Sequence, residues 1–161
     1  MASAADEEAR MNRSIGLWSS SFLLGPLMIA TLVVGAVPLA RADETVEVKL
    51  TDKGMESMRM DLSTKQIRAG KVIFNVTNAS QSLTHEFVVV RSDKPIESLQ
   101  YNEDEKEIGE KALEVVNEIE DIQPGQSSTL AVNLELGSYV LLCNKAGHFK
   151  AGMVNQLSVT K

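Results

Sequence analysis

Between residues 45 and 160 the chain contains a series of short segments in which apolar and polar residues alternate. Such alternation is typical of β-strands that bury one face. Gly, Pro, Asn, Asp and Ser cluster between the segments, as expected for turns. The expected strands are Thr45–Leu50, Ser57–Leu62, Lys71–Thr77, Thr84–Val90, Ser128–Leu134, Ser138–Cys143 and Val154–Thr160. This number of short strands predicts an all-β fold, a Greek-key two-sheet β-sandwich.

Two stretches depart from simple alternation. The continuous apolar run at 87–90 predicts a strand that is buried on both faces. Farther along, apolar residues recur at helical spacing after a densely charged stretch, namely Ile108, Ala112, Val115, Val116 and Ile119. This spacing predicts one short helical insertion around residues 107–118, packed on the outside of a sheet.

The first 42 residues resemble an export signal. Arg10 and Arg13 precede an apolar stretch from Phe22 to Ala40, and Ala40-Arg41-Ala42 fits a cleavage pattern with small residues. We therefore expect residues 1–42 to be a signal peptide and residues 43–161 to be one domain, periplasmic or secreted. Retention of the apolar stretch as a membrane anchor is the alternative.

Charge and cysteine content restrict the function further. The chain has 16 Lys and Arg against 22 Asp and Glu, a net charge of −6, which disfavours nucleic-acid binding because phosphates require a basic face. An exported protein normally uses cysteines in pairs, as disulfides. Cys143 is the single cysteine and cannot pair within the chain, so a metal site would explain its presence.

Four residues provide the donors for such a site. Cys143, His148 and Met153 are separated by equal steps of five residues, and His85, the other of the two histidines, begins the strand-like run at 85–90. One thiolate, two imidazoles and a weak axial thioether are the ligands of a mononuclear blue-copper centre. The sequence therefore predicts one copper ion, cycling between Cu(I) and Cu(II), held by His85, Cys143, His148 and Met153. Zinc also binds Cys and His, but its structural sites rarely include Met.

The segment Leu142–Met153, with the strand-like residues before it, resembles the copper loop of the cupredoxins, the superfamily of plastocyanin and azurin. Its Cys-x4-His-x4-Met spacing is similar to that of phytocyanins and rusticyanin. The resemblance covers roughly residues 45–161. It implies a type 1 copper protein that shuttles single electrons between partner proteins, such as a cytochrome or a copper or haem oxidoreductase, with His148 as the exit for the electron. We expect a monomer that is not an enzyme.

A copper-binding protein for storage, delivery or resistance is the alternative function. Met55, Met58 and Met60 form a cluster that could recruit Cu(I), although strand packing is the commoner role of such residues. Glu86 stands where cupredoxins often have Asn, so its hydrogen-bonding role is open. Asn144 is expected to hydrogen-bond locally and stiffen the loop. Lys145 and Lys150 flank His148, and they are either a positive rim for docking or ordinary loop residues.

Overall fold

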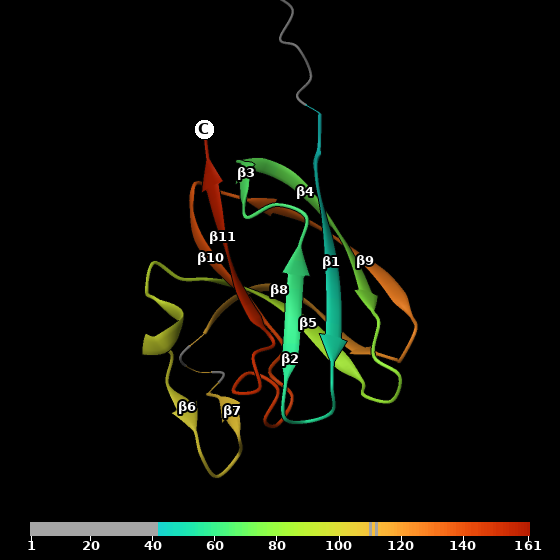
Figure 1. Ribbon diagram of the computed structural model, residues 1–161. Coiled ribbons are helices and arrows are strands. Elements are labelled where there is room, and N and C mark those ends of the chain that lie inside the picture. The colour runs from blue at the N-terminus through green and yellow to red at the C-terminus, as the bar shows by residue number, and fades with distance from the viewer. Residues whose placement is uncertain (1–41, 110, 112) are drawn as a thin grey trace, which may run out of the picture. The chain divides into compact units, whose positions relative to one another are not determined.

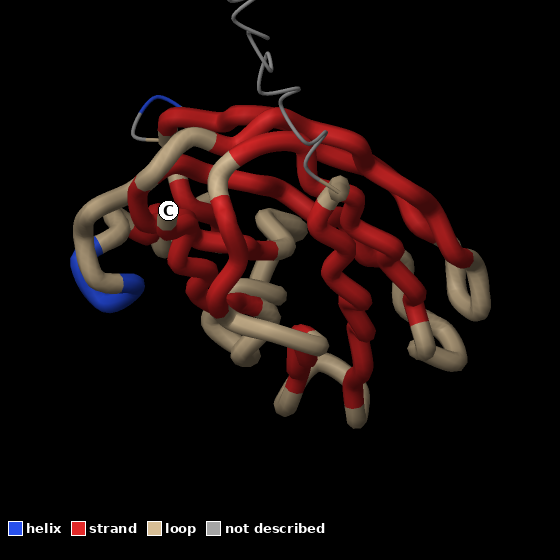
Figure 2. The backbone as a smooth tube through the Cα atoms, turned by 90° about the horizontal axis from the view of Figure 1, so that it is seen from above, coloured by secondary structure: helices blue, strands red, loops and turns tan. Residues whose placement is uncertain are grey.

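The computed structural model describes residues 42–161 except residues 110 and 112, so the proposed leader lies outside the described residues but for Ala42. In the described part, no helix has the length and apolar character needed to cross a membrane. Strands make up most of the backbone, and helical turns are short (Figure 2). The elements are β1 (Glu44–Asp52), β2 (Met58–Leu62), β3 (Gln66–Arg68), β4 (Gly70–Asn78), β5 (His85–Arg91), η1 (Ile96–Ser98), β6 (Tyr101–Asn102), β7 (Glu107–Ile108), β8 (Glu114–Ile122), β9 (Ser127–Leu134), β10 (Gly137–Leu142) and β11 (Val154–Thr160).

The strands form two main sheets, so the predicted all-β, two-sheet architecture is confirmed. One sheet has the order β2-β1-β4-β9 and the other the order β3-β11-β10-β5-β8, while β6 and β7 pair as a small hairpin (Figure 1). β1 runs parallel to β4, and β11 runs parallel to β3. Strands adjacent in a sheet are therefore often distant in sequence, which lets the fold join residues that are far apart in the chain.

The central strands of the five-stranded sheet are buried on both faces, as predicted for residues 87–90. Phe87 and Val89 point into the main core between the sheets, whereas Val88 and Val90 belong to a second cluster on the opposite face. β10 alternates in the same way, and its core-facing residues continue to Cys143, which is fully buried. The pleat of β10 therefore directs the cysteine side chain inward.

The prediction of a short helix around residues 107–118 is wrong. Glu107 and Ile108 form β7, and β8 begins at Glu114 and pairs with β5 at the edge of the sheet. The apolar spacing was misleading because it joined Ile108, in the hairpin, to residues of a separate strand. β8 is rich in β-branched residues, which favour extended backbone. Val115 and Val116 are 43% and 38% exposed, so the pattern marks an edge strand rather than a buried helix face.

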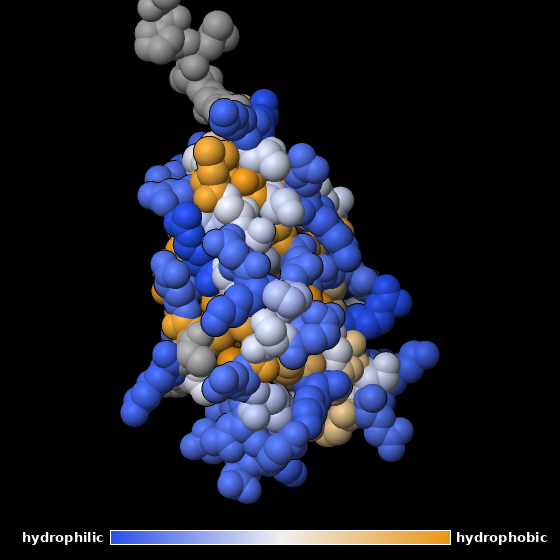
Figure 3. All heavy atoms as spheres, turned by 90° about the vertical axis from the view of Figure 1, so that its left-hand side faces the viewer, coloured by the Kyte–Doolittle hydropathy of each residue, from blue (hydrophilic) through white to orange (hydrophobic). Residues whose placement is uncertain are grey.

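Three connections meet at one end of the sandwich, the lower end in Figure 1: the β1–β2 turn, the β6–β7 hairpin and the β10–β11 loop. The amide of Met58 donates to the carbonyl of Ala151 at 2.8 Å, which joins the start of β2 to the loop. The amide of Gly147 donates to the carbonyl of Lys106 at 2.7 Å, which joins the loop to the hairpin. The β10–β11 loop is therefore held from two sides, by β2 and by the hairpin. Figure 3 shows that the lower end, where this charged hairpin lies, is strongly hydrophilic.

Candidate metal centre

The predicted donors come from two neighbouring strands and the loop that follows one of them. His85 is the first residue of β5, and Cys143 directly follows β10. The two strands pair in antiparallel fashion, with Leu142 opposite Val88. Because of this register, His85 and Cys143 meet at the same end of the sheet although they are distant in sequence. His148 lies in the loop between β10 and β11.

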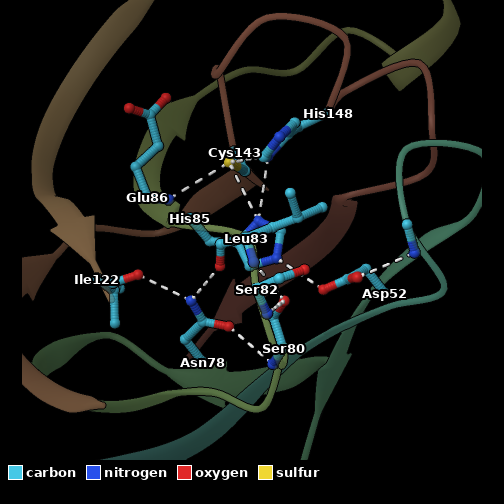
Figure 4. A network of polar contacts seen from close by, with 11 residues as sticks. Asp52, Asn78, Ser80, Ser82, Leu83, His85, Glu86, Ile122, Cys143 and His148 are labelled. Atoms are coloured by element: carbon cyan, nitrogen blue, oxygen red, sulfur yellow. Dashed lines mark hydrogen bonds and ion pairs between the residues drawn. The ribbon is translucent and has the colours of Figure 1, made fainter. Parts of the chain in front are cut away.

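Figure 4 shows the three side chains converging. The Nδ1 atoms of His85 and His148 are 3.1 Å apart, and the Sγ atom of Cys143 lies 3.3 Å from Nδ1 of His148 and 4.0 Å from Nδ1 of His85. His85 and Cys143 are fully buried, and His148 is only 5% exposed. Two nitrogens and a sulfur that face one another without an intervening carboxylate suit a soft cation.

Met153 closes the same loop. Its amide donates to the carbonyl of His148 and its carbonyl accepts from the amide of Cys143, both at 3.0 Å. Its side chain is fully buried in the main core together with Cys143. The backbone thus ties Met153 directly to two of the donors, while its thioether as an axial ligand stays a prediction.

Glycine allows the loop to pack tightly at Gly152. Gly152 has φ +106°, and a Cβ atom there would lie 2.6 Å from the carbonyl oxygen of Met58. A side chain could not be accommodated without moving backbone, because the nearest atom belongs to the main chain. Gly152 thus allows β2 to approach the loop directly before Met153.

Glu86 has the hydrogen-bonding role that its sequence position left open. Its amide donates to the Cys143 sulfur at 3.3 Å, and its carboxylate accepts from the amide of Asn144 at 2.5 Å. The Asn144 side chain bonds both backbone groups of Ile108, at 2.7 and 3.0 Å. Asn144 therefore stiffens the loop, but through the hairpin rather than through the local bond that was expected.

Asp52 is a functional candidate that the sequence analysis missed. Its Oδ2 atom lies 3.3 Å from Nε2 of His85, on the side of the ring opposite to Nδ1. Asp52 is the last residue of β1, just before a turn, and belongs to no recognisable sequence motif. Only the three-dimensional structure therefore reveals its contact with His85. Nearby, Asn78 is fully buried; it donates to the carbonyls of Leu83 and Ile122 at 2.8 Å and accepts from the amide of Ser80. These bonds fix the segment that leads into His85.

Burial determines the protonation states of the candidate donors. It raises the pKa of Cys143 to about 11, so the thiol of the metal-free protein is neutral. Burial, together with the charges of His85 and Lys145, lowers the pKa of His148 to about 4. The pKa of His85 is also lowered, chiefly by burial, although Asp52 opposes the shift. Both imidazoles are therefore neutral near pH 7, the form in which histidine binds metals.

The Glu86 carboxyl is affected by the same environment. Burial raises its pKa, and the nearby acids Glu118 and Glu107 add to the effect. The bond from Asn144 and the charge of Lys145 act in the opposite direction.

A family comparison agrees with this geometry. The model of the Sulfocyanin (SoxE) domain matches residues 37–161. The chain belongs to the sulfocyanin family. Sulfocyanins are cupredoxins, which bind copper, so the resemblance noted from the sequence is confirmed. A comparison with curated protein sequences finds no significant match.

Solved structures share the fold of this sulfocyanin domain. Auracyanin A, a "blue" copper protein from Chloroflexus aurantiacus, has a TM-score of 0.53 and 14% identity over 74% of this chain and 100% of its own. Auracyanin from Roseiflexus castenholzii has a TM-score of 0.50 and 19% identity over 71% and 97%. Rusticyanin from Thiobacillus ferrooxidans has a TM-score of 0.51 and 16% identity over 73% and 78%. At these identities the likeness establishes the fold alone.

The methionine cluster of the sulfocyanin domain divides into two kinds. Met58 and Met60 are 3% exposed and belong to the main core, so packing, the favoured interpretation, is confirmed for them. Met55 is 52% exposed, and its Cε atom lies 3.3 Å from the position of a Cβ atom on Gly147. Met55 therefore sits on the surface beside the residue that precedes His148.

Proposed function

We propose that this protein carries single electrons between partner proteins through one copper ion held by His85, Cys143, His148 and Met153. The observation that supports the proposal is the convergence of two imidazole nitrogens and one thiol sulfur at one buried point. Copper bound there would supply a one-electron Cu(I)/Cu(II) couple.

The burial of the donors favours a carrier over an enzyme. Catalytic metal sites keep a position open for water or substrate. Here His85, Cys143 and Met153 are fully buried, and His148 is nearly so. Bonds from Glu86, Asn144 and Gly147 to neighbouring segments hold the donors in place. A preorganised site needs little rearrangement when the charge of its ion changes, and this property suits electron transfer.

His148 is the proposed exit for the electron, because it is the only imidazole of the pair with any exposure. Exposed Ala146 and Gly152 lie close to it in the loop. The flanking lysines do not favour a positive docking rim: Lys145 pairs with Asp121 at 2.8 Å, and Lys150 pairs with Glu103. The proposed partner is a redox protein such as a cytochrome or an oxidoreductase.

Voltammetry of two variants tests the axial assignment. Met153→Gln would replace a thioether by a harder amide oxygen, which favours Cu(II), so the reduction potential should fall while the site stays coloured. Met60→Gln is the matched control, because Met60 is equally a core methionine and should affect stability more than potential. A larger potential drop in Met60→Gln would show that the wrong methionine was assigned.

Copper storage, delivery or resistance is the second candidate, and Met55 is the observation that favours it. An exposed thioether beside Gly147 could pass Cu(I) to or from His148. Met55→Leu separates the two functions. If the protein is a carrier, the wild type and Met55→Leu should both keep their copper in the presence of a Cu(I) chelator and should exchange electrons at the same rate. A delivery protein should lose copper readily, and Met55→Leu should slow that loss.

The proposal includes export. Its support is the leader pattern of residues 1–42, with cleavage before Asp43. Intact mass and N-terminal sequencing of the protein expressed in a bacterium test it: we expect a chain that starts at Asp43 outside the cytoplasm. A full-length, membrane-bound chain would favour the anchor alternative.

A further inference from the structure

A buried carboxylate lies behind one of the candidate ligands. The Asp52 side chain is 6% exposed, and its Oδ2 atom is 3.3 Å from Nε2 of the fully buried His85 (Figure 4). Asp52 ends β1 in the four-stranded sheet, whereas His85 begins β5 in the five-stranded sheet. The pair therefore joins the two sheets directly behind the donor cluster.

Other groups fix the orientation of this carboxylate. The amide of Gly54 donates to Oδ1 of Asp52 at 3.0 Å, while Oδ2 faces Nε2 of His85. The Ser80 hydroxyl accepts hydrogen bonds from the amides of Ser82 and Leu83, at 3.2 and 2.8 Å, and so holds the segment that leads into His85. Both oxygens of Asp52 are thus held in place, so the carboxylate can fix the orientation of the His85 ring.

The contact determines which nitrogen of His85 is available. A carboxylate can only accept a hydrogen bond, so Nε2 of His85 carries the proton and donates it to Asp52. Nδ1 is then unprotonated, and this is the atom that faces Cys143 and His148. A carboxylate behind a ligating histidine fixes the ring, fixes the tautomer and makes the imidazole a better donor.

We propose that Asp52 is a positioning residue that orients His85 toward copper and lowers the reduction potential of the site. The inference rests on the proposed copper function. A negative charge behind the imidazole stabilises the more highly charged Cu(II) state more than Cu(I). The same effect should strengthen copper binding, and most strongly the binding of Cu(II).

Asp52→Asn tests the role with little change in shape. We expect the affinity for copper to fall about 10–100-fold. The loss should be larger for Cu(II) than for Cu(I), so the potential should rise; a tenfold difference corresponds to about 59 mV. The matched control is Asp61→Asn, which removes the same charge from an exposed residue that pairs with Arg59. Its affinity and potential should stay close to those of the wild type.

A second measurement needs no variant and no copper. Nitrogen-15 NMR of the metal-free wild type near neutral pH should show His85 protonated at Nε2 and unprotonated at Nδ1. A proton at Nδ1 of His85, or an unchanged potential and affinity in a folded Asp52→Asn protein, would overturn the inference. Failure of the copper function itself is distinguishable, because the wild type would then lack the charge-transfer colour while the tautomer result still stands.

Discussion

The β10–β11 loop and the start of β5 contribute to one donor cluster in different ways. The loop supplies Cys143, His148 and Met153 within eleven residues, and its own backbone bonds tie the three together. β5 supplies His85 alone, and its orientation depends on Asp52 and Asn78, from other strands. The loop is a local structure, whereas the His85 side is built from long-range contacts.

This difference has a mechanical consequence. A change within the loop should disturb several donors together, because they share one short backbone segment. A change near β5 should disturb His85 while the loop donors keep their arrangement. One variant on each side, with a matched control, compares the two sides by the free energy of unfolding.

The largest effect is expected from Asn78→Ala, which removes the long-range support. The change would leave the Ser80 amide and the Leu83 and Ile122 carbonyls without their partner. Each buried group left unpaired costs about 1–3 kcal/mol of unfolding free energy. Asn75→Ala on the same strand is the control, since its side chain bonds surface groups and should cost within about 0.5 kcal/mol. Urea unfolding measures both, and equal losses would contradict the assigned role of Asn78.

A somewhat smaller effect is expected from Gly152→Ala, which disturbs the loop. A residue other than glycine at positive φ costs about 1–3 kcal/mol, and the contact of a Cβ atom with the Met58 carbonyl adds to that. Gly125→Ala is the control, because Gly125 has φ +74° but no atom within 4 Å of its Cβ position. Urea unfolding should show the greater loss for Gly152→Ala; similar losses would mean that β2 does not restrain the loop.

The pH dependence of copper binding compares the donors themselves. Between the pKa of His148, about 4, and that of Cys143, about 11, the imidazole is neutral and the thiol protonated. Near neutral pH, where burial keeps His85 neutral as well, binding releases one proton, from Cys143, so the affinity should rise about tenfold for each pH unit. Below about pH 4 the slope should steepen, because His148 must also lose a proton. Competition titrations measure the slope, and a flat profile near neutral pH would indicate a thiolate already present without metal.

The same contrast explains what the sequence could predict. The equal spacing of Cys143, His148 and Met153 is visible in the chain because the loop is local. The contact between Asp52 and His85 is invisible there, since it depends on how two sheets pack. Glu86 stands out in the sequence because it follows His85, but its bond to Asn144 depends on the pairing of β5 with β10.

The fold shows a similar limit at β8. The alternating strands were predictable because a half-buried strand repeats every second residue. β8 pairs with β5 at a sheet edge, with two shifts of register and exposed valines, so its apolar spacing resembles that of a helix. Only the presence of the neighbouring strand decides between the two, and a single sequence does not contain that information.

The absorption spectrum of the Cu(II)-loaded wild type, compared with that of Cys143→Ser, decides whether the chain forms a type 1 copper site. We expect an intense visible charge-transfer band in the wild type, because the Cys143 thiolate would bind the ion together with His85 and His148. The band should be absent in Cys143→Ser, since a hydroxyl group replaces the sulfur. A colourless wild type after Cu(II) loading, or an unchanged band in Cys143→Ser, would exclude a copper site built on the Cys143 thiolate.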